Sequence, residues 1–240
     1  MRKISGYSSV RGFTLAELTI VLVIVALLIG GLTVPLSAQI DQRDYNETRR
    51  QLEEIRESLI GFAVVYGRLP RPAVSFADGR ENPNNCSGDS NCTGFIPWST
   101  LGVKKTDAWG KMIRYSVTPA YVADVGFNLE SLGKKKVKGV DSYLIGTKEE
   151  NCSKKYPCSP AVILSHGRNN FGTTPDGAEI ANGSTTNADE KTNAEATTNT
   201  FIARDPSNAS TASGGEFDDI VVWIPPYLLF NRMVAAGRLP

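Results

Sequence analysis

The chain has 240 residues, with 26 lysines and arginines against 25 aspartates and glutamates, and a formal net charge of +1. This balance excludes a strongly basic protein that binds nucleic acid over its whole surface. The length suits one domain with a sizeable core in addition to a membrane segment. Short basic runs at residues 104–105 and 134–136 are interpreted as solvated turns, so no nucleic-acid partner is predicted.

The first element in chain order is an uncharged, mostly apolar run over residues 18–40. As a helix it would be roughly 35 Å long, enough to cross a hydrocarbon core of about 30 Å. Residues 1–12 contain Arg2, Lys3 and Arg11 and no acidic residue, so the N-terminus is predicted to be cytoplasmic and the rest exported. A secretory signal peptide would need a small-x-small cleavage site, which is missing. A simple membrane anchor would leave Glu17, at the edge of the run, unexplained.

The residues at this edge resemble a known processing segment. Residues 12–22 resemble the class III leader and N-terminal helix of type IV pilins and type II secretion pseudopilins: Gly12-Phe13-Thr14-Leu15-Ala16-Glu17-Leu18-Thr19-Ile20-Val21-Leu22. The resemblance implies a leader over residues 1–12, cleavage by prepilin peptidase between Gly12 and Phe13, and N-methylation of Phe13. It also implies a role in filament assembly for Glu17, the fifth residue of the mature chain.

The same resemblance implies a location and a set of partners. Residues 13–40 would form a transmembrane and assembly helix in the bacterial inner membrane, and residues 41–240 a periplasmic globular domain. The implied partners are prepilin peptidase, other pilin or pseudopilin subunits, an inner-membrane assembly platform and membrane lipid. Inside an apolar filament, the Phe13 ammonium of a neighbouring subunit is a natural partner for the Glu17 carboxylate. The alternative is a periplasmic binding module that keeps its membrane anchor permanently.

Residues 41–66 predict a second, amphipathic half of the helix, which packs on the domain. Its apolar positions recur at every third or fourth residue: Leu52, Ile55, Leu59, Phe62, Ala63 and Tyr66. Gly67 is expected to end the helix. The strand candidates are residues 113–117, 140–145, 161–165 and 219–224. One long helix followed by about four strands predicts an α+β fold with an antiparallel sheet packed on the helix.

The four cysteines form two pairs of equal spacing, Cys86 with Cys92 and Cys152 with Cys158. In an oxidising compartment, disulfides are the expected state. Four cysteines allow three connectivities, and the turn residues inside each short loop favour the local pairing. A zinc site made of four thiolates usually has closer spacing.

A second resemblance concerns the domain. Residues 107–110 (Asp-Ala-Trp-Gly) are similar to the Asp-Pro-Trp-Gly turn of major pseudopilins, and residues 165–167 and 217–220 resemble their C-terminal sheet and loop. In that group the loop often binds calcium, so Asp176, Asp218 and Asp219 are calcium candidates. Their spacing fits no compact calcium loop, and acidic turn residues are the preferred interpretation. No firm metal site and no cofactor is predicted.

The remaining sequence is polar and offers little chemistry. Residues 172–216 are rich in Thr, Asn, Ala, Ser and Gly, and predict an exposed, flexible insert. The single histidine, His166, lies beside Ser165, but nucleophilic catalysis needs a positioned partner and oxyanion donors. We interpret His166 as a structural loop residue and the chain as non-enzymatic. A proline pair and a glycine bound a last short helix over residues 225–237.

Overall fold

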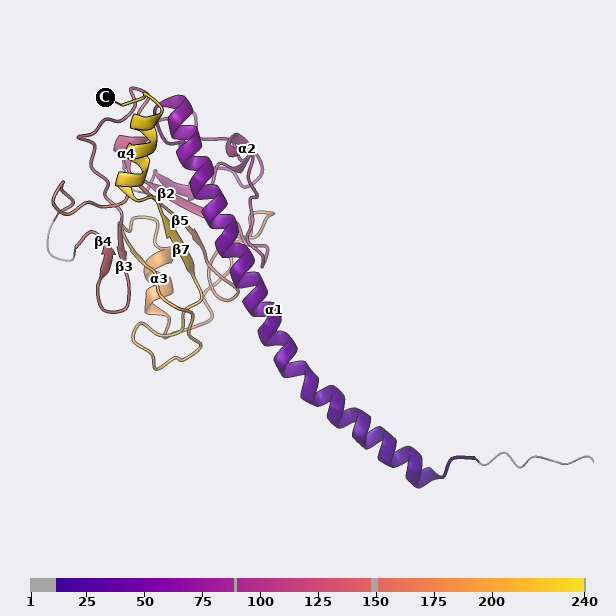
Figure 1. Ribbon diagram of the computed structural model, residues 1–240. Coiled ribbons are helices and arrows are strands. Elements are labelled where there is room, and N and C mark those ends of the chain that lie inside the picture. Colours follow the sequence, from indigo (N-terminus) through magenta and orange to yellow (C-terminus); the bar gives the residue numbers. More distant parts are fainter. Residues whose placement is uncertain (1–11, 89, 148–150, 240) are drawn as a thin grey trace, which may run out of the picture. The chain divides into compact units, whose positions relative to one another are not determined.

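The computed structural model describes residues 12–88, 90–147 and 151–239, without the side chains of residues 30–36. The chain divides into two compact units, Met1–Arg43 and Asp44–Pro240. The helices are α1 (Leu15–Tyr66), α2 (Trp98–Leu101), the 3-10 turn η1 (Pro119–Tyr121), α3 (Ala188–Ala194) and α4 (Pro226–Ala235). The strands are β1 (Thr93–Phe95), β2 (Arg114–Val117), β3 (Lys136–Lys138), β4 (Tyr143–Ile145), β5 (Ala161–Ser165), β6 (Thr200–Ile202) and β7 (Ile220–Trp223). Figure 1 labels the elements.

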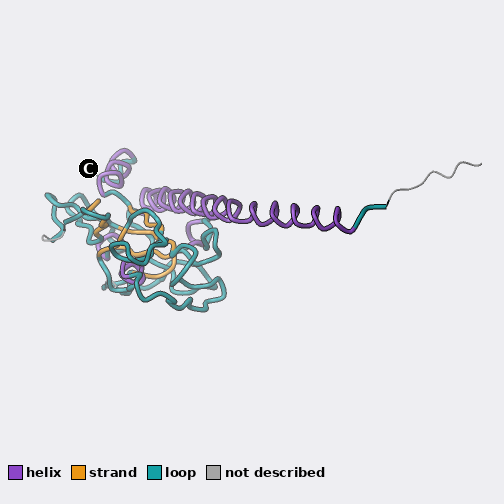
Figure 2. Tube along the Cα trace, turned by 90° about the horizontal axis from the view of Figure 1, so that it is seen from below, coloured by secondary structure: helices purple, strands orange, loops and turns teal. Residues whose placement is uncertain are grey.

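The main sheet of the second unit is antiparallel, with the strand order β1-β2-β5-β7. In both views the C-terminal part of α1 runs along this sheet (Figures 1 and 2). All five residues of β5 are buried because both faces of the strand are covered. Ala161 and Ile163 pack in the core that includes the α1 side chains, whereas Val162 and Leu164 pack on a second, smaller sheet. The predicted α+β fold is confirmed.

The amphipathic half of α1 packs as its sequence pattern predicts. Leu52, Ile55, Leu59 and Ala63 are all at most 1% exposed. Tyr66 is the exception, because its side chain is 63% exposed. The helix ends at Gly67 as expected: this residue has φ +74°, in the left-handed region that glycine adopts without strain, and its amide donates to the carbonyl of Ala63 at 2.8 Å.

The second sheet, with the order β4-β3-β6, corrects the strand prediction. The candidate strand over residues 140–145 is shorter than expected, and as β4 it pairs with β3 in this sheet rather than in the main sheet. The fourth strand of the main sheet is β1, which the sequence pattern does not reveal. It has only three residues, and pairing with β2 and a 2.7 Å hydroxyl contact between Thr93 and Ser116 hold it in place.

The polar segment over residues 172–216 is more ordered than its composition suggests. It contains α3 and β6, and the side chains of Asn193 and Phe201 are fully buried. Asn193 donates to the carbonyl of Ile202 at 3.0 Å and accepts from the Ile202 amide at 2.7 Å. The expectation of an exposed insert is therefore wrong for this part, since buried hydrogen bonds satisfy polar groups that composition alone places in solvent.

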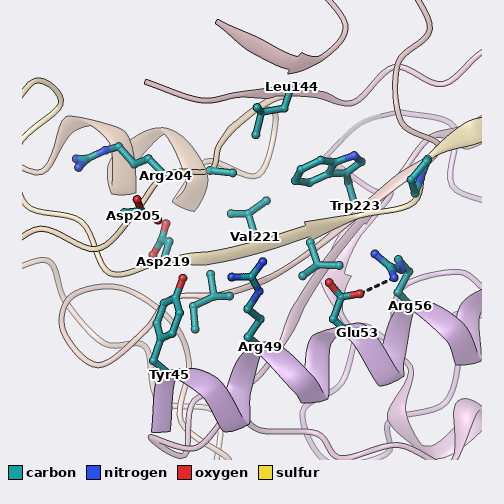
Figure 3. Close-up of a pocket in the computed structure, with 14 residues that line it drawn as sticks. Tyr45, Arg49, Glu53, Arg56, Leu144, Arg204, Asp205, Asp219, Val221 and Trp223 are labelled. Carbon is teal, nitrogen blue, oxygen red and sulfur yellow. Dashed lines mark ion pairs between the residues drawn. The ribbon is translucent and has the colours of Figure 1, made fainter. Parts of the chain in front are cut away.

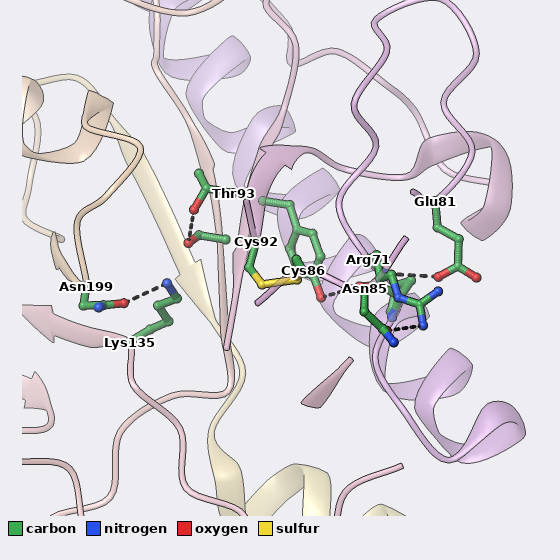
Figure 4. Close-up of a disulfide and its surroundings, with 11 residues drawn as sticks. Arg71, Glu81, Asn85, Cys86, Cys92, Thr93, Lys135 and Asn199 are labelled. Atoms are coloured by element: carbon green, nitrogen blue, oxygen red, sulfur yellow. Dashed lines mark hydrogen bonds between the residues drawn. A yellow bond between two sulfur atoms is a disulfide. The ribbon is translucent and has the colours of Figure 1, made fainter. Parts of the chain in front are cut away.

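Both cysteine pairs form the local disulfides predicted, Cys86–Cys92 and Cys152–Cys158. The first lies in the core, where Cys92 is fully buried (Figure 4). Arg71 anchors the adjoining loop, because its guanidinium donates to Asn85 Oδ1 at 2.6 Å. The disulfide loop is thereby attached to the segment that follows α1.

The C-terminal helix α4 begins and ends close to its predicted limits. Leu229 and Met233 are its buried contacts with the core. Beyond the helix, the guanidinium of Arg238 donates to the carbonyls of Val64 and Val65 at 2.8 and 2.7 Å. These bonds attach the end of the chain to the last turn of α1.

Candidate functional site

The first described residues form the N-terminal boundary of α1. The amide and the hydroxyl of Thr14 both donate to Glu17 Oε2, at 2.8 Å each. The Glu17 amide in turn donates to Thr14 Oγ1 at 3.2 Å. This reciprocal pattern is a capping box, which satisfies amides that have no partner in the first turn of a helix. This capping box was not predicted, although the Thr14-x-x-Glu17 spacing is its sequence signal.

Gly12 and Phe13 are not packed against other described residues. A Cβ placed on Gly12 would meet no atom of the described residues within 4 Å. The Phe13 side chain is 87% exposed. Packing against the described residues therefore requires neither a glycine at position 12 nor a large apolar residue at position 13.

The first part of α1 carries apolar side chains on all its sides. Leu15 and Leu27 are 84% and 71% exposed, and every residue between them is exposed as well. A helix with this pattern needs apolar surroundings that its own chain does not supply. Within the described part of the chain, no helix combines the length and the hydropathy of a membrane-crossing segment.

In the globular unit, the Asp-Ala-Trp-Gly segment forms a turn closed by the Asp107 side chain. Asp107 Oδ1 accepts from the amides of Trp109 and Lys111 at 3.0 and 2.8 Å, and Oδ2 accepts from the Ser165 hydroxyl at 2.6 Å. Burial raises the pKa of Asp107, and the hydrogen bonds from Ser165 and from these amides oppose that effect. The Ala108 amide donates to Oγ1 of the fully buried Thr48 of α1 at 3.1 Å. The turn therefore links α1 to β5.

The segments of the second resemblance meet in space. Ser165 Oγ, which donates to Asp107, accepts from the Gly167 amide at 3.0 Å. His166 Nδ1 lies 3.4 Å from Asp219 Oδ1, inside the protein. The neighbouring Ser165 and His166 thus have separate carboxylate partners. Both side chains have structural contacts here, which agrees with the interpretation of His166 as a loop residue.

Two of the three calcium candidates come together, and a residue that the sequence did not indicate joins them. One carboxylate oxygen from each of Glu190, Asp218 and Asp219 lies within 4.8 Å of the others. Asp176 is not part of this group; its carboxylate is exposed and accepts from the hydroxyl of Thr174. Glu190 comes from α3, inside the segment expected to be exposed, so only tertiary structure reveals it.

The environment of Asp218 is unusual for a carboxylate. Burial, together with the charges of Glu190 and Asp219, raises its pKa to about 7. Its Oδ2 accepts from the Asn169 amide at 2.8 Å, while the buried Oδ1 has no hydrogen-bond partner among the described residues. The nearby Lys111 ammonium donates to backbone carbonyls of residues 166 and 170. The Lys111 ammonium therefore adds a positive charge near this acidic group.

A groove of about 340 Å³ follows the outer edge of β7 (Figure 3). No described strand pairs with this edge. The charged residues of its lining are Arg49, Arg56, Arg204, Glu53, Asp205 and Asp219. Glu53 forms an ion pair with Arg56 at 2.6 Å. With equal numbers of acids and arginines, the lining does not favour a ligand of one charge.

The second unit is an α+β domain, and a capping box stands at the start of α1. Residues 7–33 match the family described as the prokaryotic N-terminal methylation motif. This motif is typical of type IV pilins and type II secretion pseudopilins, structural proteins that prepilin peptidase processes and that are anchored in the inner membrane before assembly. No curated protein and no solved structure matches the chain. Residues 7–11 of the motif lie outside the described residues.

Proposed function

We propose that the chain is a structural subunit of a type IV pilus or a type II secretion pseudopilus, as a pseudopilin or a minor pilin. Prepilin peptidase cuts between Gly12 and Phe13, and the new Phe13 amine is methylated. The match to the methylation motif over residues 7–33 is the observation that carries this proposal. The open surroundings of Gly12 support it, because no described residue packs against the cleavage position.

Before assembly the subunit is a single-pass protein of the bacterial inner membrane. Residues 13–40 lie in the membrane, the N-terminus is cytoplasmic, and the domain of residues 41–240 is periplasmic. The exposed apolar side chains of residues 15–29 support this arrangement, since they need a lipid or protein environment. In the filament, the same surface is covered by the helices of neighbouring subunits.

Glu17 has two roles in this proposal. In the single subunit its carboxylate caps α1 through Thr14. In the filament it pairs with the methylated Phe13 ammonium of a neighbouring subunit, because methylation keeps the positive charge of the amine. A carboxylate in an apolar filament core needs such a partner, and losing it typically costs about 3 to 5 kcal/mol.

The test compares two glycine variants in cells that have the peptidase and the assembly platform. Gly12→Leu places a bulky residue at the cleavage position, and Gly88→Leu is the matched control because a Cβ at Gly88 also meets nothing within 4 Å. We expect the wild type and Gly88→Leu in the sheared filament fraction, with Gly12→Leu retained uncut in the membrane. Recovery of Gly12→Leu in filaments at the wild-type level would contradict the proposal. A wild-type chain that stays uncut in the membrane would instead favour a permanently anchored periplasmic module.

A further inference from the structure

The ammonium group of Lys111 lies among backbone carbonyl oxygens of the turn at residues 166–170. Nζ donates to the carbonyls of His166 at 3.2 Å and Asn170 at 2.9 Å, and it also contacts the carbonyl of Asn169. Lys111 is only 4% exposed, and a Cβ on Gly172 would lie 3.1 Å from its Cδ. Three backbone carbonyls of the turn therefore contact this one side chain.

The ammonium faces an excess of negative charge. Glu190 lies on α3, and Asp218 and Asp219 directly precede β7. Their carboxylates favour the charged form of Lys111, and so does the Asp107 carboxylate. Burial acts in the opposite direction and lowers the pKa of Lys111. Like charges in a buried group are unfavourable without a counter-ion. Lys111 supplies that counter-ion from within the chain.

The turn also closes tightly over Asp218. A Cβ on Gly167 would lie 2.5 Å from Asp218 Oδ1 and 2.3 Å from the Asp218 carbonyl, so only glycine fits there, and its φ of +57° is left-handed. The Asn169 amide donates to Asp218 Oδ2 from the same turn. The carbonyl oxygens of the turn point to Lys111 while its amide holds Asp218. A cation at this position thus stabilises the turn and the carboxylates together.

Carbonyl and carboxylate oxygens are also the ligands that a hard divalent cation such as Ca²⁺ prefers. Here the carbonyls bind Nζ, whose charge would repel a metal ion placed beside it. We propose that the Lys111 ammonium is a built-in cation that takes the place of a metal ion in this turn. The stability of the domain is then independent of divalent cations. This inference does not depend on the proposed filament function.

The test uses the full-length protein in detergent and measures the Tm with calcium or with EDTA. Lys111→Met keeps a side chain of similar length and removes the charge. Lys104→Met is the matched control, because Lys104 is exposed and its ion pair with Glu47, at 3.4 Å, lies on the surface. We expect the wild type and Lys104→Met to have the same Tm in both conditions. Lys111→Met should lose on the order of 10 °C in EDTA and regain much of that loss in calcium.

A higher Tm of the wild type in calcium than in EDTA would overturn the proposal. So would a Lys111→Met variant whose Tm in EDTA equals that of the wild type. A Lys111→Met variant with a lowered Tm that calcium does not raise would overturn it as well. If Lys111→Met does not fold, calcium titration of the wild type by calorimetry decides the question. Saturable binding that Asp218→Asn abolishes would refute the built-in cation. Absence of such binding in the wild type would uphold it.

Discussion

Thr14 and Glu17 are hydrogen-bonded to each other at the start of α1: the amide and the hydroxyl of Thr14 donate to one carboxylate oxygen of Glu17 at 2.8 Å each. The Glu17 carboxylate therefore has a partner before any filament forms. For it to bind a neighbouring subunit's ammonium, it must share this contact or exchange it. The capping role and the assembly role are consequently separable by mutation.

Thr14→Ala removes the hydroxyl that accepts from the residue-17 amide but keeps the carboxylate, whereas Glu17→Leu removes the carboxylate and keeps that hydroxyl. Loss of an N-cap typically costs about 1 kcal/mol, so Thr14→Ala should lower the yield of sheared filaments by less than about fivefold. Glu17→Leu should lower it by more than about tenfold, because the Phe13 ammonium loses its partner. Mass spectrometry of the membrane fraction checks that both variants are inserted and cut. Equal yields of sheared filaments for the two variants would show that Glu17 has no role in assembly beyond capping α1.

Thr48 connects α1 to the Asp107 turn through the Ala108 amide. Thr48→Val keeps the shape of the side chain but leaves this amide without an acceptor, at a cost of about 1 to 2 kcal/mol. The Tm should fall by about 2 to 8 °C. Thr48→Ser, which keeps the hydroxyl, serves as the control and should lose less. A Thr48→Val variant as stable as Thr48→Ser would show that the link contributes nothing.

The raised pKa of Asp218, about 7, predicts a pH dependence of stability. An unfolded aspartate ionises near pH 4, so between about pH 4 and pH 7 the folded chain binds a proton that the unfolded chain has released. The contribution of Asp218 to stability therefore falls as the pH rises through this window. Asp218→Asn cannot ionise, so its Tm minus that of the wild type should increase from pH 4 to pH 8.

Asp176→Asn is the control for this measurement. The hydrogen bond from the Thr174 hydroxyl lowers the pKa of Asp176, so its contribution to stability is present at neutral pH and is lost as the pH falls. The Tm difference for Asp176→Asn should thus not increase with pH. A flat Tm difference for Asp218→Asn would contradict the raised pKa.

Loop-closure entropy predicts that each disulfide stabilises the fold by about 2 kcal/mol, because each closes a short loop with a sequence separation of 6. The Cys86 and Cys92 pair lies in the core, whereas Cys152 is only partly buried. Replacing the first pair by serines should therefore lower the Tm more than replacing the second, since it also places hydroxyls in the core. Thermal unfolding of the two double variants checks the order.

Those parts of the fold with a strong local pattern could be predicted from the sequence. The apolar spacing from Leu52 to Ala63 predicts the packed face of α1, and the continuous apolar run of β5 predicts a buried strand. The local disulfides follow from the short spacing of the cysteines. The short strand β1 and the placement of β4 in a second sheet depend on pairing partners distant in the sequence, and no local pattern reveals them.

The candidate site was predictable to a similar degree. The N-terminal segment could be predicted because it matches a contiguous sequence motif over residues 7–33, which can be identified without the fold. The positions of Glu190 and Lys111 near Asp218 could not be predicted, because α3 and the turn at residues 107–111 approach Asp218 only in the tertiary structure. The polar composition of residues 172–216 did not indicate that Asn193 is buried, because its burial depends on hydrogen bonds to Ile202 and Asp219.

The most direct test of the central claim is mass spectrometry of the N-terminus of the membrane-extracted protein, from cells with and without prepilin peptidase. We predict a chain that begins at N-methylated Phe13 in cells with the peptidase and at Met1 in cells without it. A chain that begins at Met1 in both strains would contradict processing and assembly as a filament subunit.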